Sequence, residues 1–162
     1  MPKRDLLIEI GVEEMPAPLV APTAEQLKEK LVQWLSEKRI PYDKAAWYGT
    51  PRRSAVLVHG VSEQQEALDE QFRGPARRIA VDEQGDWTKA ALGFARGKGV
   101  ATDALFFQEY KGEAYVYARK RQEGQATVDL LAQDLERLLT SLSFPTTMRW
   151  GSYSLRFIRP IR

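Results

Sequence analysis

Side chains that could transfer a proton or hold a metal are few in this sequence of 162 residues. His59 is the single histidine and there is no cysteine, so neither a thiolate zinc site nor a disulfide framework can form. His59 lies in a run of alternating residues typical of a strand, and we expect it to be structural. Glu13 and Glu14 are adjacent, so on extended chain they point to opposite faces and do not form a pair for acid–base work. We therefore expect no catalytic residue and no metal site.

The glycines of the segment GFARGKG, residues 93–99, could in principle cradle a phosphate. They follow a short amphipathic segment instead of an apolar strand, and their spacing is not that of a P-loop. A helix end at which Gly97 or Gly99 takes a positive φ explains them better. Arg96 and Lys98 within the segment remain available to bind phosphate.

Basic residues are the strongest functional signal, although the net charge is only +2, from 24 basic and 22 acidic residues. The bases gather in patches, and the last fourteen residues contain four arginines and no acid. Arginine suits phosphate because its planar guanidinium donates two parallel hydrogen bonds. The alternative is that these patches are solvated faces and strand ends. The candidate RNA contacts are Arg52, Arg53, Arg77, Arg78, Arg96, Lys98, Arg149, Arg156 and Arg159.

Aromatic residues offer a second way to bind RNA, by stacking on bases. Trp150, between Arg149 and Gly151, could stack on a base, but core packing is the usual role of a tryptophan near a strand. Five further aromatics are spread over an expected hairpin without an RNP-like motif, so a base-stacking platform has little support; they are Phe106, Phe107, Tyr110, Tyr115 and Tyr117.

Two elements near the amino terminus are well defined by their patterns. Residues 5–11 are almost continuously apolar, which predicts a central strand covered on both faces. Leu27, Leu31, Trp34 and Leu35 share one face of a helix that ends before Pro41. The capping-box spacing of Thr23 and Gln26 predicts a start at Thr23, or one to two turns earlier.

Later elements alternate between strands and helices. We predict strands at 45–49, 52–61, 78–82 and 155–161, a break at Gly74-Pro75, a turn at 83–86, a short helix from Thr88 to Ala95, a hairpin of 105–108 with 114–119, and a helix from Thr127 whose apolar stripe is Val128, Leu131, Leu135, Leu138, Leu139 and Leu142. This order predicts an α+β or mixed α/β fold, with helices packed on a mostly antiparallel or mixed sheet.

Composition limits the class of protein. With 43% hydrophobic and 28% charged residues the chain is globular, and its length suits one domain or one domain with a small excursion. No apolar run approaches the roughly 20 residues of a membrane helix, and the start has no apolar core of a signal peptide. These features and the lack of cysteine lead us to expect a cytoplasmic protein.

Five blocks in fixed order resemble the amino-terminal region of the beta subunit of bacterial heterotetrameric glycyl-tRNA synthetase. They are LLIEIGVEEMP (6–16), TPRRSAVLV (50–58), RGPA (73–76), TKAALGFARGKGV (88–100) and MRWGSYSLRFIRP (148–160). Departures are small, such as Val12 where the family often has Thr and Thr147 where it has Lys. The resemblance covers Leu6 to Arg162 and implies that residues 1–162 are a single amino-terminal domain of a longer beta subunit.

The resemblance implies partners and cofactors. The alpha subunit carries the class II active site, where ATP, with Mg, and glycine form glycyl-adenylate before glycine passes to the tRNA 3′ end. Expected partners are the alpha subunit, the remainder of the beta subunit and tRNA(Gly), with no membrane and no cofactor in this domain. The region is also similar in fold to the substrate-binding and editing module of the phenylalanyl-tRNA synthetase beta subunit.

The expected function is therefore that of a non-catalytic tRNA-binding and assembly domain of a glycine–tRNA ligase. A vestigial or active hydrolytic editing domain is an alternative, although glycine is the smallest amino acid and competitors can be excluded by size. A purely structural docking module is the other alternative.

Overall fold

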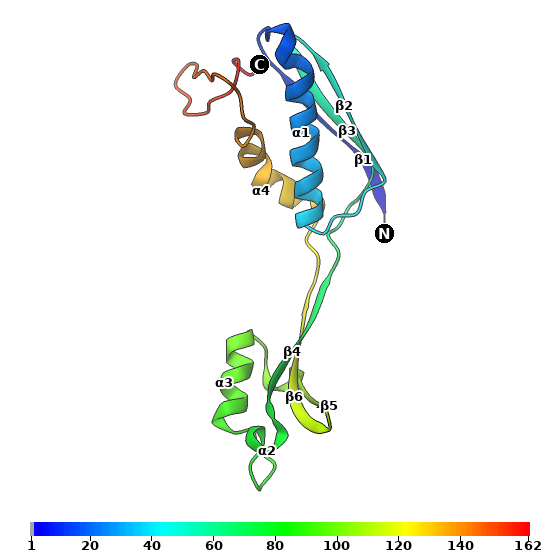
Figure 1. Cartoon of the computed structure of the whole chain (residues 1–162), viewed down its shortest axis with the longest axis vertical. Coiled ribbons are helices and arrows are strands. Elements are labelled where there is room, and N and C mark those ends of the chain that lie inside the picture. Colours follow the sequence, from blue (N-terminus) through cyan, green and yellow to red (C-terminus); the bar gives the residue numbers. More distant parts are fainter. Residues whose placement is uncertain (1) are drawn as a thin grey trace. The chain divides into compact units, whose positions relative to one another are not determined.

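The computed structural model describes residues 2–162, which form an α+β fold of two antiparallel three-stranded sheets and four helices, as predicted (Figure 1). In chain order the elements are β1 (Lys3–Gly11), α1 (Ala17–Glu37), β2 (Lys44–Thr50), β3 (Arg53–Ser62), β4 (Leu68–Ala76), α2 (Arg77–Ala80), α3 (Lys89–Lys98), a 3₁₀ turn (Thr102–Ala104), β5 (Leu105–Tyr110), β6 (Glu113–Gln122) and α4 (Thr127–Thr140).

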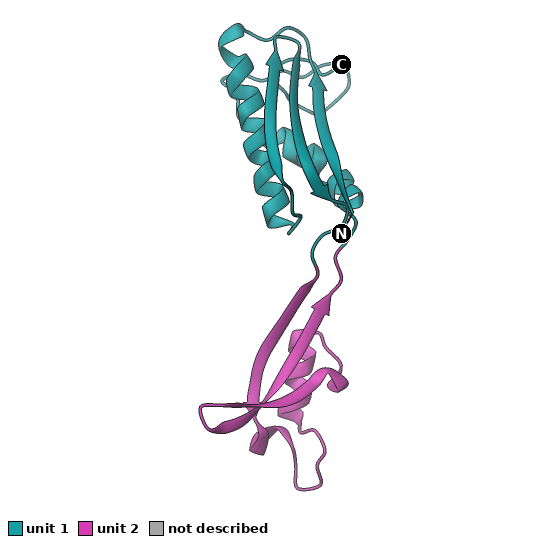
Figure 2. Ribbon diagram, turned by 90° about the vertical axis from the view of Figure 1, so that its right-hand side faces the viewer, with its two compact units in different colours: residues 1–66, 125–162 teal, residues 67–124 magenta. Residues whose placement is uncertain are grey.

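The chain divides into two compact units (Figure 2). Unit 1 comprises residues 1–66 and 125–162, and unit 2 comprises residues 67–124. Each unit has its own sheet and its own cluster of buried apolar residues. That residues 1–162 act as one amino-terminal domain stays a prediction, and so does the likeness to the phenylalanyl-tRNA synthetase module. Within residues 2–162 no helix is long and apolar enough to cross a membrane.

In unit 1 the helix α1 packs against a sheet of order β1-β3-β2. Its predicted apolar face is confirmed, because Leu27, Leu31 and Leu35 are fully buried with Val56 of β3. The helix begins at Ala17, the earlier of the starts that the pattern allowed. Thr23 lies inside the helix and is only 3% exposed, because its side chain is buried and does not cap the helix start.

The strand β1 is not the central strand that its sequence predicts, because β3 holds the centre and β1 lies at the edge. Ile8 and Ile10 face the core, whereas Leu7 is 57% exposed. Alternate residues of a strand point to opposite faces, and only one face of this sheet is covered by α1.

The carboxy-terminal part of unit 1 differs more from expectation. In α4 the predicted stripe is largely confirmed, because Leu138 and Leu142 are buried and Leu131, Leu135 and Leu139 pack against the core. Only Val128, at the start of the helix, is 75% exposed, and Leu130 is buried in its place. The predicted strand at 155–161 is wrong: only isolated bridges form, between Met148 and Phe157 and between Val12 and Ile161. Phe157 and Ile158 are both buried, which a strand covered on one face does not permit.

In unit 2 the sheet order is β4-β6-β5, and α2 and α3 contact it. The strand predicted at 78–82 is wrong: α2 occupies Arg77–Ala80 and buries Ala80 against α3. Gly74-Pro75 does not break the chain but lies within β4, at an irregularity between Arg73 and Ala76. A Cβ on Gly74 would lie 2.6 Å from the Phe94 ring, so a glycine is needed for α3 to approach the sheet.

The ends of α3 and the hairpin follow the sequence closely. Gly99, at φ +67°, ends α3, and its amide donates to the Arg96 carbonyl oxygen. Thr88 precedes the helix, but its hydroxyl donates to the Ile79 carbonyl oxygen at 2.6 Å and does not cap it. The predicted hairpin of β5 and β6 turns at Lys111-Gly112, both with positive φ.

Candidate nucleic-acid interface

The structure brings three of the predicted RNA contacts together in unit 1, around the loop between Met148 and Phe157. The bridge between these two residues joins the backbone directly beside Arg149 and Arg156. Arg159 reaches the same place, with its Nη1 3.8 Å from the Met148 Sδ. Three basic side chains therefore meet at the base of one exposed loop.

This arginine loop has few acids to neutralise it. Residues 137–162 contain no Asp or Glu. Arg149 is exposed and forms no ion pair with any residue of 2–162. Arg156 donates from Nε to the Thr147 hydroxyl at 2.9 Å, which braces the loop without cancelling the charge. Both positive charges remain available to an anion.

Arg159 and Arg162 anchor this segment to the end of β1. Arg159 donates from Nε to the Glu14 carbonyl oxygen at 3.2 Å, so its role is largely structural. Arg162 forms two 2.8 Å hydrogen bonds to the Glu13 carboxylate, and these lower the pKa of Glu13 below its usual value. The backbone adds a bond from the Arg162 amide to the Gly11 carbonyl oxygen at 2.8 Å.

Arg52 and Arg53 lie at the turn between β2 and β3, next to that anchor. The Arg53 Nη1 is 2.8 Å from Glu9 Oε1, so an acid of β1 already neutralises it. Arg52 is exposed and without an ion pair inside the described part of the chain, while its carbonyl oxygen accepts the Val12 amide at 2.9 Å. The sequence blocks 6–16, 50–58 and 148–160 thus meet at one end of the unit 1 sheet.

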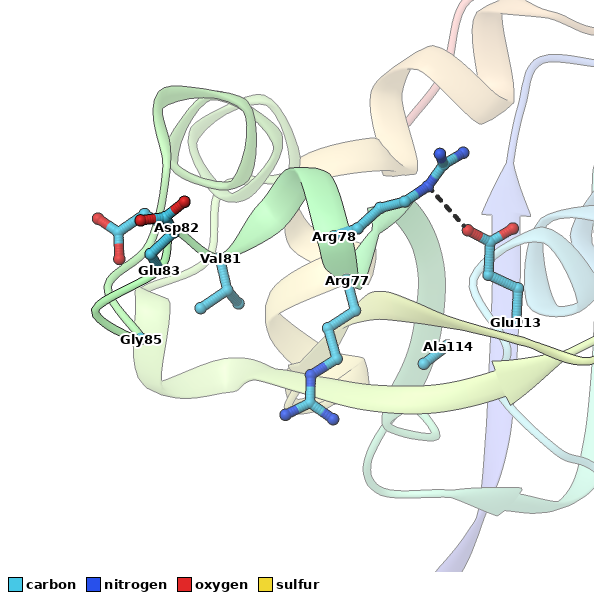
Figure 3. A pocket seen from close by; sticks show the side chains of 8 residues that line it. All are labelled: Arg77, Arg78, Val81, Asp82, Glu83, Gly85, Glu113 and Ala114. Carbon is cyan, nitrogen blue, oxygen red and sulfur yellow. Dashed lines mark hydrogen bonds and ion pairs between the residues drawn. The ribbon is translucent and has the colours of Figure 1, made fainter.

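In unit 2, Arg77 and Arg78 line a hollow of about 540 Å³ beside α2 (Figure 3). Their side chains diverge from the short helix. Arg78 turns to Glu113, with its Nε 3.1 Å from Oε1, whereas Arg77 points away and its guanidinium lies 4.8 Å from the centre of the Phe107 ring. Of the two, only Arg77 keeps a charge without an acidic partner.

Arg96 and Lys98 lie in the last turn of α3, where cations favour the negative end of the helix dipole. The Lys98 Nζ is 4.6 Å from the centre of the Phe72 ring, and Arg96 is exposed. The amide of Thr88, just before α3, bonds to the Ala80 carbonyl oxygen of α2, so α2 meets the first residue before α3, whereas Arg96 and Lys98 lie at the other end of that helix. The predicted contacts of unit 2 therefore form two pairs and not one patch.

Arg73 is a cation that the sequence reasoning missed. Its guanidinium lies 4.4 Å from the centre of the Tyr110 ring and 5.5 Å from that of Tyr115. The arginine stands in the RGPA block, but the strand register that brings it to the tyrosines is not a local signal. Among residues 2–162, every contact of a cation over an aromatic ring lies in unit 2.

Two other residues that could have had a functional role, His59 and Trp150, make contacts within unit 1. The Nδ1 of His59 lies 3.0 Å from Asp5 Oδ2, and the Gly60 amide together with His59 lowers the pKa of Asp5. Trp150 is partly buried against the core of unit 1, the more usual of its two predicted roles.

Comparison with known proteins identifies close relatives. Residues 6–162 match the family described as glycyl-tRNA synthetase beta subunit. The chain is 52% identical over 162 residues to the glycine–tRNA ligase beta subunit of Halalkalibacterium halodurans, 49% over 162 residues to that of Bacillus subtilis, and 47% over 156 residues to that of Limosilactobacillus reuteri. These alignments cover 96% to 100% of this chain and 22% to 24% of the relatives, so the chain spans less than a quarter of their length.

Proposed function

Because the chain belongs to the glycyl-tRNA synthetase beta subunit family, we propose that it is a non-catalytic tRNA-binding and assembly domain of a glycine–tRNA ligase. In this proposal the domain helps to hold tRNA(Gly) while the alpha subunit, with ATP, attaches glycine to the tRNA 3′ end. The isolated domain performs no chemistry itself.

The arginine loop is the observation that carries the tRNA-binding part of the proposal. Arg149 and Arg156 are exposed, lie side by side at the base of the loop, and have no acidic partner in residues 2–162. Their loop is fixed at its base by the bonds of Arg159 and Arg162. A charge that is positioned before binding loses less entropy when it meets a phosphate.

The assembly part is supported by the uncovered face of the unit 1 sheet. Leu7 of β1 and Tyr48 of β2 are exposed on the face opposite to α1, where Leu7 pairs with Leu57 of β3 and Tyr48 pairs with Ala55 of the same strand. Exposed apolar side chains that gather on one face are typical of surfaces that meet another polypeptide. The relatives' greater length leaves ample chain for such a contact.

A holoenzyme of alpha and full-length beta subunits tests the proposal. Reversing the charge with Arg149→Glu is expected to raise the KM for tRNA in glycylation about tenfold, since a lost and reversed phosphate contact weakens binding by more than 1 kcal/mol. ATP–pyrophosphate exchange with glycine, which needs no tRNA, is expected to stay at the unmodified rate.

The matched control is Lys44→Glu, which reverses an exposed cation of unit 1 at the far end of the sheet. It should leave the KM for tRNA unchanged. An unchanged KM in Arg149→Glu, or an equal fall in pyrophosphate exchange, would contradict the assignment of the loop to tRNA.

A further inference from the structure

One face of the unit 2 sheet is not covered by helices. Val116 of β6 and Phe72 of β4 lie on the side of α3, as the contacts of Phe94 and Lys98 show. Directly opposed residues of paired strands share a face. The pairings of Tyr117 with Phe106 and with Arg73, and of Gln108 with Tyr115, therefore put these side chains on the other, open face.

The open face is aromatic. The Phe106 and Tyr117 rings lie 5.9 Å apart and within 24° of parallel, which gives a broad flat surface. Tyr110 and Tyr115 lie on the same face in an edge-to-face pair, with ring centres 6.3 Å apart and 72° between their planes. Tyr110 is 40% exposed, so a planar ligand can reach this surface. Of the five aromatic residues in the predicted hairpin, all but Phe107 therefore lie on one face of the sheet.

Two cations without acidic partners lie beside these rings, whereas the nearby Glu113 accepts the Tyr115 hydroxyl and is already paired with Arg78. Arg73 lies over Tyr110 and Tyr115, and the Lys111 Nζ is 5.5 Å from the centre of the Tyr110 ring. Neither cation forms an ion pair with residues 2–162, whereas Arg119 on the same face is paired with Asp69 at 2.6 Å. The rings are therefore bordered by two cations without acidic partners.

We propose that this open face binds unpaired nucleotides of RNA, with bases stacked on Phe106 and Tyr117, and with Arg73, which lies over Tyr110, and Lys111 near phosphates. Stacking suits any base because every base has a π face, and it excludes duplex, whose bases are already stacked. Two cations without acidic partners favour a polyanion over an apolar protein surface. The inference rests on the proposed RNA-binding function and adds the class of RNA that this unit recognises.

The test compares a fluorescein-labelled single-stranded RNA of eight adenosines with an RNA duplex of 12 base pairs, by fluorescence anisotropy on the 162-residue chain. Tyr110→Leu and Tyr117→Leu remove flat rings and keep apolar bulk. Each is expected to weaken single-strand binding by about fivefold or more and to change duplex binding little. The salt dependence should not change, because no charge is removed.

The matched control is Phe107→Leu, which lies on β5 like Tyr110 and is 39% exposed, but on the helix side of the sheet. It should leave single-strand affinity unchanged, and thermal unfolding of all three variants verifies that they fold. Unchanged single-strand affinity in both tyrosine variants would overturn the proposal, as would an equal loss of affinity for single-stranded and duplex RNA. If the tyrosine variants bind single-stranded RNA normally but the double variant Arg149→Gln with Arg156→Gln binds tRNA more weakly, the proposed tRNA-binding function stands and only the role of the open face is refuted.

Discussion

The arginine loop makes a quantitative prediction about salt. An arginine that neutralises one phosphate contributes about 0.7 to 0.9 to the slope of log K against log salt concentration. Replacing both Arg149 and Arg156 by glutamine should therefore reduce the slope for tRNA by about 1.4 to 1.8. Between about 50 and about 200 mM salt, the unmodified chain should lose roughly 7- to 12-fold more affinity than the double variant.

The assay is a titration of labelled tRNA(Gly) with each protein at five or more salt concentrations. The control is the double variant Arg4→Gln with Arg137→Gln, which likewise removes two positive charges from unit 1. Arg4 is paired with Glu63, and the Arg137 Nη2 is 3.1 Å from Asp134 Oδ1, so neither charge is free for a phosphate. The control should keep the slope of the unmodified chain.

Two results would refute the reasoning. An equal reduction of the slope in both double variants would mean that only net charge matters and that the loop has no special role. An unchanged slope in the Arg149 and Arg156 variant, with an intact thermal transition, would mean that the loop does not contact tRNA.

Three further predictions concern stability. Leu31→Ala leaves a cavity in the fully buried core of unit 1 and should lower the free energy of unfolding in urea by about 3 kcal/mol; a loss below about 1 kcal/mol would contradict that burial. Gly74→Ala pushes a methyl group against the Phe94 ring and should destabilise unit 2 by about 1 to 3 kcal/mol, followed by fluorescence of Trp87, and an unshifted transition would be incompatible with the contact. The hydrogen bonds from Arg162 lower the pKa of Glu13, so the stability that they add is complete above the ordinary pKa near 4.5 and is lost as the pH falls through the lower pKa of the folded state. The thermal unfolding temperature of Glu13→Gln should therefore fall less than that of the unmodified chain between about pH 5 and 3. An equal fall in both proteins would argue against the pair.

Local signals predicted the elements that depend on neighbouring residues. The face of α1 follows from the spacing of Leu27, Leu31 and Leu35, and Gly99 ends α3 because it tolerates a positive φ. The α+β class was correct for the same reason, since it needs only the order and type of the elements. The hairpin at Lys111-Gly112 likewise required no knowledge of the rest of the chain.

Features that depend on distant partners could not be predicted in this way. The run of apolar residues in β1 suits a central strand, yet its place at the edge is decided by β3. Residues 77–80 form a helix because Ala80 packs against α3, although a short apolar run also suits a strand. Gly74 predicts a break in the chain when it is considered with its neighbours alone, whereas in the structure a glycine is needed because the Phe94 ring packs against it.

The candidate site was predicted in kind but not in arrangement. Arginine type and the absence of nearby acids pointed to Arg149 and Arg156, which are exposed and have no acidic partner among residues 2–162; that they contact RNA stays a prediction. The same criterion also chose Arg53, Arg78 and Arg159, whose partners lie far away in the sequence. Arg73 was missed because only the strand register reveals its tyrosines.

The most direct test of the central claim is a titration of the 162-residue chain with tRNA(Gly), beside a non-cognate tRNA, over a series of salt concentrations. The proposed function predicts binding that is tighter for tRNA(Gly) and that weakens steadily as salt rises. Equally weak binding of both tRNAs, or none, would contradict it and would leave the domain as a scaffold for the synthetase.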